Sequence, residues 1–151
     1  MDGREAADIA LEALQKAGSE KSVARVGVGE LTELNIESGK ITLLRSTFNT
    51  SISFKALVGD RKGTTSTNQL DADSIRTAAG QAVEMAKSSE PDPANEIAER
   101  QEPEEFSCGI DEPDRDLMYD RLEEFRDSVR KSYPDTILEQ VILKFRSGTS
   151  W

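Results

Sequence analysis

The chain has 151 residues, 36% of them hydrophobic, and a formal net charge of −10 at pH 7. This length and composition suit one domain with a modest apolar core, with or without a short extension. The negative charge opposes attraction to nucleic acid phosphates and anionic membrane surfaces, and no apolar run approaches the roughly 20 residues of a membrane-spanning helix. The acidic, helix-patterned N-terminus does not look like a signal peptide. We therefore expect a cytoplasmic protein that binds neither nucleic acid nor membrane directly.

The residue types limit the chemistry further. The chain has no histidine and one cysteine, Cys108. Without histidine, neither the usual nucleophile–base relay nor a zinc site with imidazole ligands can form. A single cysteine excludes an internal disulfide and fits a reducing compartment. Neighbouring carboxylates disfavour a reactive thiolate at Cys108, so we interpret it as an incidental thiol.

The N-terminal part of the sequence predicts a helix and then a sheet. Apolar residues at helical spacing precede a glycine suited to a left-handed C-cap, Gly18. The helical residues are Ile9, Ala10, Ala13, Leu14 and Ala17. Alternation of apolar and polar residues then predicts one strand over 22–28 and a second over 33–38, which ends in a tight turn at Ser38–Gly39. A third strand begins at Lys40.

The strongest strand pattern lies in residues 51–58, where apolar and mostly polar residues alternate. Gly59–Asp60 has the residue order of a type II′ hairpin turn, after which the chain returns as "RKGTTST". A helix is predicted near residues 71–87, with acidic residues and Ser74 at its start. Its predicted buried stripe is rich in alanine and would let the helix lie close to a sheet: Ile75, Ala78, Ala79, Ala82, Val83 and Ala86.

The stretch that follows is acidic, contains most of the prolines and has one basic residue, Arg100. This composition is typical of a linker or an extended arm. Beyond it, apolar spacing predicts a third helix that stops before Pro134 and carries Met118, Leu122, Phe125 and Val129 on one face. Residues 137–145 alternate as a last strand.

These elements predict an α+β fold, in which an antiparallel meander sheet of about four to five strands has helices packed on one face. The expected organisation is an N-terminal α+β domain (1–90), an acidic Pro-rich linker (91–113), and a helix and strand (114–151) that continue the same domain or start the next.

The hairpin around Gly59 is one candidate contact site. Arg61, Lys62 and the "GTTST" run could bind an anion through amides and hydroxyls, but the glycines lack phosphate-loop spacing. An exposed turn with two solubilising charges is the favoured interpretation. The full set of candidate turn or partner-facing residues is Gly39, Gly59, Asp60, Arg61, Lys62 and Gly63.

Other candidate groups have simpler explanations. Glu37, Asp60 and Asp71 lie near strand ends, where carboxylates solvate turns and cap helices more often than they bind metal. Phe48 and Phe54 could stack on a base, yet core packing explains Phe54 better. The sheet edges are the more serious candidates, because an exposed edge can accept an extended peptide by strand addition; the alternative is an edge covered by another domain or subunit. We predict neither catalytic nor metal-ligating residues.

Residues 23–93 resemble the N-terminal domain of the TldD/PmbA proteins, also called modulators of DNA gyrase. The resemblance rests on the turn "ESGKI", on the hairpin, strand and helix start "GDRKGTTSTNQLDADSI", and on the helix end "AVEMAKSSEPDP". The last stretch, "DTILEQVILKFRSGTSW", is similar in position and character to the strand that follows in these proteins. "RKGTTST" and "SEPDP" look slightly closer to PmbA, also called TldE.

The resemblance implies a chain that is truncated or limited to the N-terminal domain, because family members are considerably longer. In the family, TldD carries an HExxx(H/D) metal motif and is associated with zinc-dependent proteolysis, whereas PmbA lacks a complete metal site and partners TldD. No residue here matches that motif.

We therefore expect a non-catalytic domain that scaffolds a homodimer or heterodimer with a TldD/PmbA-type subunit and helps to wall a chamber for peptide substrates. No cofactor is expected in this chain, and zinc would belong to the full-length complex or the partner. The alternative is a stand-alone protein-interaction module that modulates gyrase-poison or toxin–antitoxin systems.

Overall fold

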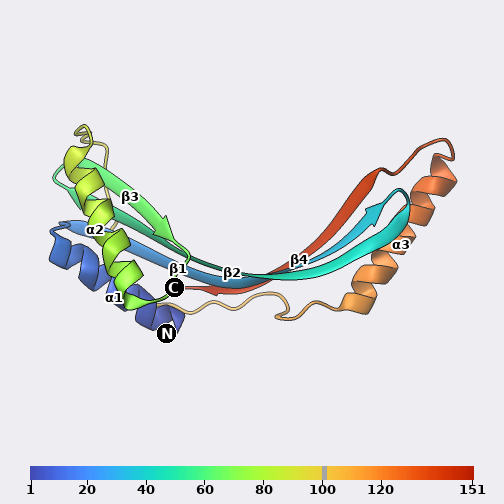
Figure 1. Cartoon of the computed structure of the whole chain (residues 1–151), viewed down its shortest axis with the longest axis horizontal. Coiled ribbons are helices and arrows are strands. Elements are labelled where there is room, and N and C mark those ends of the chain that lie inside the picture. The colour runs from blue at the N-terminus through green and yellow to red at the C-terminus, as the bar shows by residue number, and fades with distance from the viewer. Residues whose placement is uncertain (100–101) are drawn as a thin grey trace. The chain divides into compact units, whose positions relative to one another are not determined.

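The computed structural model describes residues 1–99 and 102–151, which form one antiparallel sheet and the helices around it (Figure 1). The elements are α1 (Gly3–Ala17), β1 (Lys21–Glu37), β2 (Lys40–Val58), β3 (Arg61–Thr67), α2 (Ala72–Ser88), α3 (Arg115–Ser132) and β4 (Gln140–Ser150). The strand order is β3-β2-β1-β4. The predicted α+β class is confirmed. Arg100 lies outside the described residues. None of the described helices is long and apolar enough to cross a membrane.

The strand boundaries correct the prediction in two places. Residues 22–28 and 33–37 are parts of one strand, β1, because neither Gly27 nor Gly29 has a positive φ and the backbone stays extended between them; Ser38 lies in the turn that follows. The last strand begins at Gln140 and not at 137, and it runs to Ser150. Its ladder continues to Trp151, whose N–H donates to the Val26 carbonyl at 2.9 Å while the Val26 N–H donates to the Trp151 carbonyl at 3.0 Å.

The two glycine turns have the backbone that their sequences predict. Ser38 and Gly39 both have positive φ, 50° and 77°, which is the pattern of a type I′ turn. Gly59 has a φ of 56° and Asp60 does not have a positive φ, as the predicted type II′ turn requires. Val58 pairs with Arg61 across this second turn, so its loop has two residues.

Contacts divide the chain into two compact units, each with its own core. Unit 1 contains residues 1–28, 49–106 and 149–151, and unit 2 contains residues 29–48 and 107–148.

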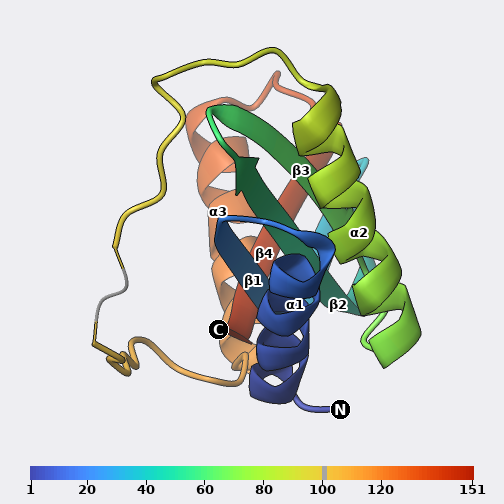
Figure 2. The same cartoon turned by 90° about the vertical axis from the view of Figure 1, so that its left-hand side faces the viewer.

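In unit 1, α1 and α2 lie side by side against one face of the strands (Figure 2). Leu14, Ile52, Phe54 and Ile75 are buried between helices and sheet, and each such side chain contributes about 1.5–3 kcal/mol to folding. The predicted alanine-rich stripe of α2 is buried in full. The cap predictions also hold: Gly18 has a φ of 102° at the end of α1. Two layers therefore account for this unit.

In unit 2, α3 covers a smaller core. Leu34 and Ile36 of β1 are buried against Met118 and Leu122 of α3. Phe125 was predicted to share this buried face but is 48% exposed, because the core cluster reaches no further along α3 than Leu122. Half-buried residues of β2 and β4 complete the cluster: Ile41, Val141, Leu143 and Phe145.

Candidate functional site

The predicted contact residues of the β2–β3 hairpin are partly occupied by the chain itself. The Asp60 carbonyl accepts hydrogen bonds from the Asp92 N–H and from Asn95 Nδ2, both at 2.9 Å. The Arg61 guanidinium donates to the Ser89 carbonyl, at the C-terminal end of α2, where a cation also complements the helix dipole. The segment after α2 therefore lies against the hairpin.

The remaining candidates have different surroundings. Lys62 is exposed, whereas Gly63 is buried beneath α2. Gly39 belongs to unit 2, where its carbonyl accepts from Arg130 Nη2 at 3.2 Å. The structure thus brings the four residues from Gly59 to Lys62 together at one hairpin and places Gly63 under a helix.

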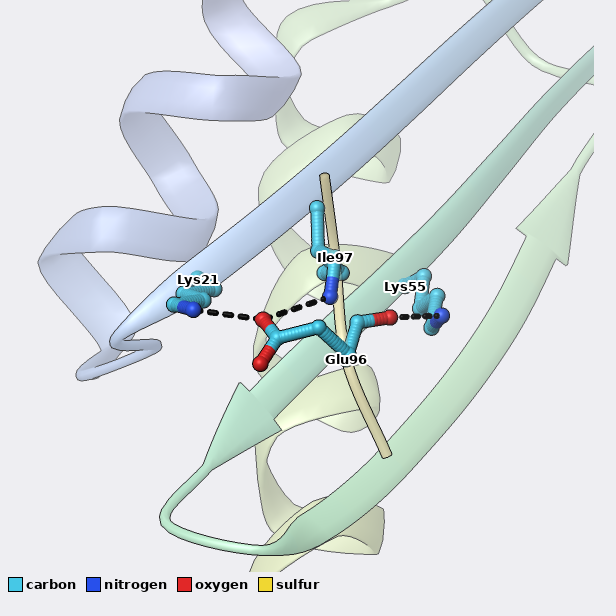
Figure 3. A network of polar contacts seen from close by, with 4 residues as sticks. All are labelled: Lys21, Lys55, Glu96 and Ile97. Carbon is cyan, nitrogen blue, oxygen red and sulfur yellow. Dashed lines mark hydrogen bonds and ion pairs between the residues drawn. The ribbon is translucent and has the colours of Figure 1, made fainter. Parts of the chain in front are cut away.

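A polar network extends this contact to the strands (Figure 3). The Glu96 carboxylate pairs with Lys21 of β1 and accepts from the Ile97 N–H at 3.0 Å. The Glu96 carbonyl accepts from Lys55 Nζ of β2 at 3.0 Å. The hydrogen bond from Lys21 lowers the pKa of Glu96, and the hydrogen bond to Glu96 raises the pKa of Lys21. Residues 92–97, called here the acidic segment, are therefore held at two strands and a hairpin.

The strand residues at this network share one face of the unit 1 sheet. Phe54 and Ala56 of β2 point into the core, so Lys55 must point to the opposite side. Pairing across β2 and β3 places Thr64 opposite Lys55 and Lys62 opposite Leu57, on that same side. On β1, Lys21 reaches the same Glu96 as Lys55, and Arg25 follows at an even spacing. We call these side chains, with their hydroxyl neighbours, the basic face: Lys21, Arg25, Ser53, Lys55, Lys62, Thr64 and Ser66.

Sequence reasoning missed the basic face, although the signal was present. The polar side of residues 51–58 was identified, but no role was assigned to it. Only the register of three strands shows that cations from β1, β2 and β3 lie on one surface.

Unit 2 has a second charged group, on the side of β1 opposite to Leu34 and Ile36. Glu33 Oε2 accepts from Arg45 Nε of β2 at 3.1 Å, and Glu33 Oε1 lies 3.2 Å from Lys144 Nζ of β4. The hydrogen bonds from Arg45 and then Lys144 lower the pKa of Glu33, whose side chain is 6% exposed. Two residues along, the buried Oδ1 of Asn35 has no hydrogen-bond partner in the described structure.

Apolar side chains are also exposed on the strands of unit 2. Phe48 is 79% exposed and Leu44 is 54% exposed on β2, and Ile142 is 41% exposed on β4. The other phenylalanine considered for ring stacking, Phe54, is 2% exposed in the core of unit 1. The strands of unit 2 therefore present apolar surface of the kind that partners cover.

The predicted metal candidates have other roles or surroundings. Asp71 is the N-cap of α2 and accepts from the Ser74 N–H at 2.9 Å, which lowers the pKa of its carboxyl. Glu37 lines a wide surface hollow of about 720 Å³ at the start of β4, together with Glu139. Cys108 is exposed. Across residues 1–99 and 102–151, no three carboxylate or thiol groups gather as metal ligands would.

Comparison with known proteins identifies the fold. Residues 23–86 match the family model described as PmbA/TldA metallopeptidase domain 1. This segment is similar to a PmbA/TldD first domain. A search of the curated proteins found no match.

Three solved structures are similar to this chain. TldE from Thermococcus kodakarensis is 13% identical with a TM-score of 0.67, covering 96% of this chain and 37% of TldE. A candidate modulator of DNA gyrase from Bacteroides thetaiotaomicron is 13% identical with a TM-score of 0.64, covering 98% and 39%. A candidate gyrase modulator from Thermotoga maritima is 12% identical with a TM-score of 0.53, covering 97% and 38%. At such identities the likeness shows the fold, and this chain spans less than two fifths of each solved chain.

The metallopeptidase description raises the question of zinc. Zinc in peptidases is usually bound through histidine, and this chain has none. Its one thiol, Cys108, is not part of a cluster of three or more potential ligands among the described residues. The donor set of the described residues therefore does not fit a catalytic zinc site, and we assign no metal-dependent step to this chain.

Proposed function

We propose that this chain is a non-catalytic N-terminal scaffold domain of a TldD/PmbA-type assembly. The observation that carries the proposal is the extent of the structural match, because 96% of the chain superposes on 37% of TldE. The match of residues 23–86 to the family's first domain supports it independently. The chain has no histidine and matches only one part of a longer solved chain. A role in positioning a partner or peptide therefore suits it better than hydrolysis.

The proposed partner is a TldD/PmbA-type subunit, in a homodimer or a heterodimer. The apolar strand surface of unit 2, formed by Leu44, Phe48 and Ile142, is the proposed contact. Exposed aromatic and aliphatic groups of this size are the side chains that dominate the binding energy of protein interfaces. The outer strands of the sheet, β3 and β4, offer further backbone groups to a partner or an extended peptide.

In the proposed assembly, the sheet walls the space in which peptide is held, and zinc is bound by the partner or by another part of the full-length subunit. This chain contributes no cofactor ligand. The proposed location is the cytoplasm. The absence of histidine supports this division of labour, because the catalytic groups must then come from elsewhere.

Complex formation tests the proposal. The purified chain is mixed with a full-length TldD-type subunit from the same genome, and the mass of the complex is measured by light scattering after size-exclusion chromatography. We expect a stable complex. The double variant Leu44→Ser/Phe48→Ser should weaken it at least about tenfold, since truncating interface anchors often costs more than 1.4 kcal/mol.

Met85→Ser is the matched control, because Met85 is 53% exposed on α2 in unit 1. It should leave the complex intact. Absence of any complex, together with binding of the chain to purified DNA gyrase, would favour the stand-alone interaction module instead.

A further inference from the structure

The basic face is unusual for a chain with a net charge of −10. Lys21 and Arg25 lie on β1, Lys55 lies on β2, and Lys62 lies on β3. Strand alternation and the β2–β3 register place these cations on the side of the sheet opposite to α1 and α2. Because the surrounding chain is acidic, this face has a local charge opposite to that of the whole molecule.

A segment of the same chain lies against the basic face. The acidic segment turns at residues 92–95, where the Asn95 N–H donates to the Asp92 carbonyl at 2.9 Å, and then passes over the face at Glu96 and Ile97. The face contacts Glu96 in two ways. Lys21 pairs with the carboxylate of Glu96, while Lys55 donates to its main-chain carbonyl at 3.0 Å. Recognition of an acidic side chain together with backbone carbonyls is suited to an extended acidic peptide.

Part of the basic face remains available. Arg25 and Lys62 are exposed, and neither forms an ion pair with any of the described residues. Between the cations lie short hydroxyl side chains, all of them exposed: Ser53, Thr64 and Ser66. Short side chains keep the surface low enough for a main chain to approach, and their hydroxyls add hydrogen-bond donors.

We propose that the basic face is a docking surface for an extended, glutamate- or aspartate-rich peptide, and that the acidic segment of this chain occupies one end of it. Charge complementarity and the observed occupant support peptide over nucleic acid, because the net charge of the chain repels a polyphosphate. The inference does not depend on the scaffold function, since it concerns binding by this chain alone.

Fluorescence anisotropy with a fluorescein-labelled decaglutamate peptide at about 0.1 M salt, where the Debye length is about 10 Å, tests the proposal. Arg25→Gln/Lys62→Gln should weaken binding about tenfold, the effect of two exposed ion pairs of up to about 1 kcal/mol each. Glu96→Gln should strengthen binding about threefold, because it releases Lys21 from the acidic segment. All three residues are exposed, so these variants should fold, and circular dichroism confirms it.

The matched control is Lys16→Gln/Lys87→Gln, which removes the same charge from the last turns of α1 and α2. It should leave affinity within about twofold, because long-range charge effects are largely screened even at moderate salt. Equal weakening by the control would overturn the proposal, since net charge alone would then explain binding. Equal affinity for decaglutamine, tighter binding of single-stranded DNA, or no gain from Glu96→Gln would each overturn it as well.

Discussion

Gly63 of β3 and Ala82 of α2 are in direct backbone contact. A Cβ atom at Gly63 would lie 1.9 Å from the Ala82 carbonyl oxygen and 2.4 Å from the Ala86 backbone nitrogen. Because Ala78, Ala82 and Ala86 have short side chains, α2 can rest on the strand where the glycine has none. This contact fixes the distance between the helix layer and the sheet in unit 1.

Gly63→Ala should destabilise the protein by about 3 kcal/mol, because the new methyl group overlaps backbone atoms that only a shift of α2 can move. The free energy of unfolding in urea measures the effect. Gly80→Ala is the matched control: Gly80 lies within α2 and a Cβ there meets nothing within 4 Å. That variant should gain about 1 kcal/mol from helix propensity. Equal changes in the free energy of unfolding for Gly63→Ala and Gly80→Ala would contradict the close packing of α2 on Gly63.

The β1–β2 turn predicts a second stability change. Ser38 has a φ of 50°, which asparagine tolerates better than serine and β-branched residues tolerate poorly. Ser38→Asn should stabilise the chain by about 0.5 kcal/mol, and Ser38→Val should destabilise it by about 1 kcal/mol. Thermal unfolding of both variants tests this. A valine variant as stable as the asparagine variant would show that the turn is not of type I′.

How far the sequence predicted the fold depended on how local each signal was. Gly18 and Asp71 were assigned correctly because capping needs only a few neighbouring residues. The break between 28 and 33 was predicted wrongly, since glycine permits a turn but does not require one, and pairing with neighbouring strands keeps β1 extended. Phe125 was misplaced because helical spacing gives a face without stating how far the opposing core reaches.

Glu33 predicts a pH-dependent stability. Its pKa is lowered by Arg45 and Lys144, so its contribution to stability is present above the ordinary value of 4.5 and is lost as pH falls through the lowered pKa. Glu33→Gln should therefore lower the urea midpoint at pH 7, and the difference from the unmodified protein should shrink below pH 4.5 and then vanish.

Glu30→Gln is the control for this experiment, because Glu30 lies on the same strand and forms no ion pair with a described residue. Its urea midpoint should equal that of the unmodified protein at pH 7 and at pH 3. A Glu33→Gln difference that is the same at pH 7 and at pH 3 would show that the ion pairs with Arg45 and Lys144 do not contribute.

Asn35 predicts a gain in stability from a loss of polarity. Its Oδ1 is buried without a partner in the described structure, and an unmade hydrogen bond of this kind costs about 1–3 kcal/mol. Asn35→Val also suits a strand, so we expect it to raise the free energy of unfolding by about 1 kcal/mol. Guanidinium unfolding measures the change, and a destabilised variant would mean that the amide makes a necessary hydrogen bond.

The candidate sites were harder to predict from the sequence than the fold. Local patterns pointed to the turn at Gly59, and they could not show that Asp92 and Asn95 return to bind the Asp60 carbonyl. Likewise, Lys21 and Glu96 meet only because the chain crosses the strands after α2. Such contacts between distant residues follow from topology, which composition and spacing do not encode.

The scaffold account is tested most directly by a peptidase assay on the purified chain, with fluorescent casein peptides and increasing zinc. The account predicts no hydrolysis by the chain alone at any zinc concentration, and hydrolysis when a full-length TldD-type subunit is added. Hydrolysis that co-elutes with the chain alone, is abolished by a chelator and returns with equimolar zinc would contradict it.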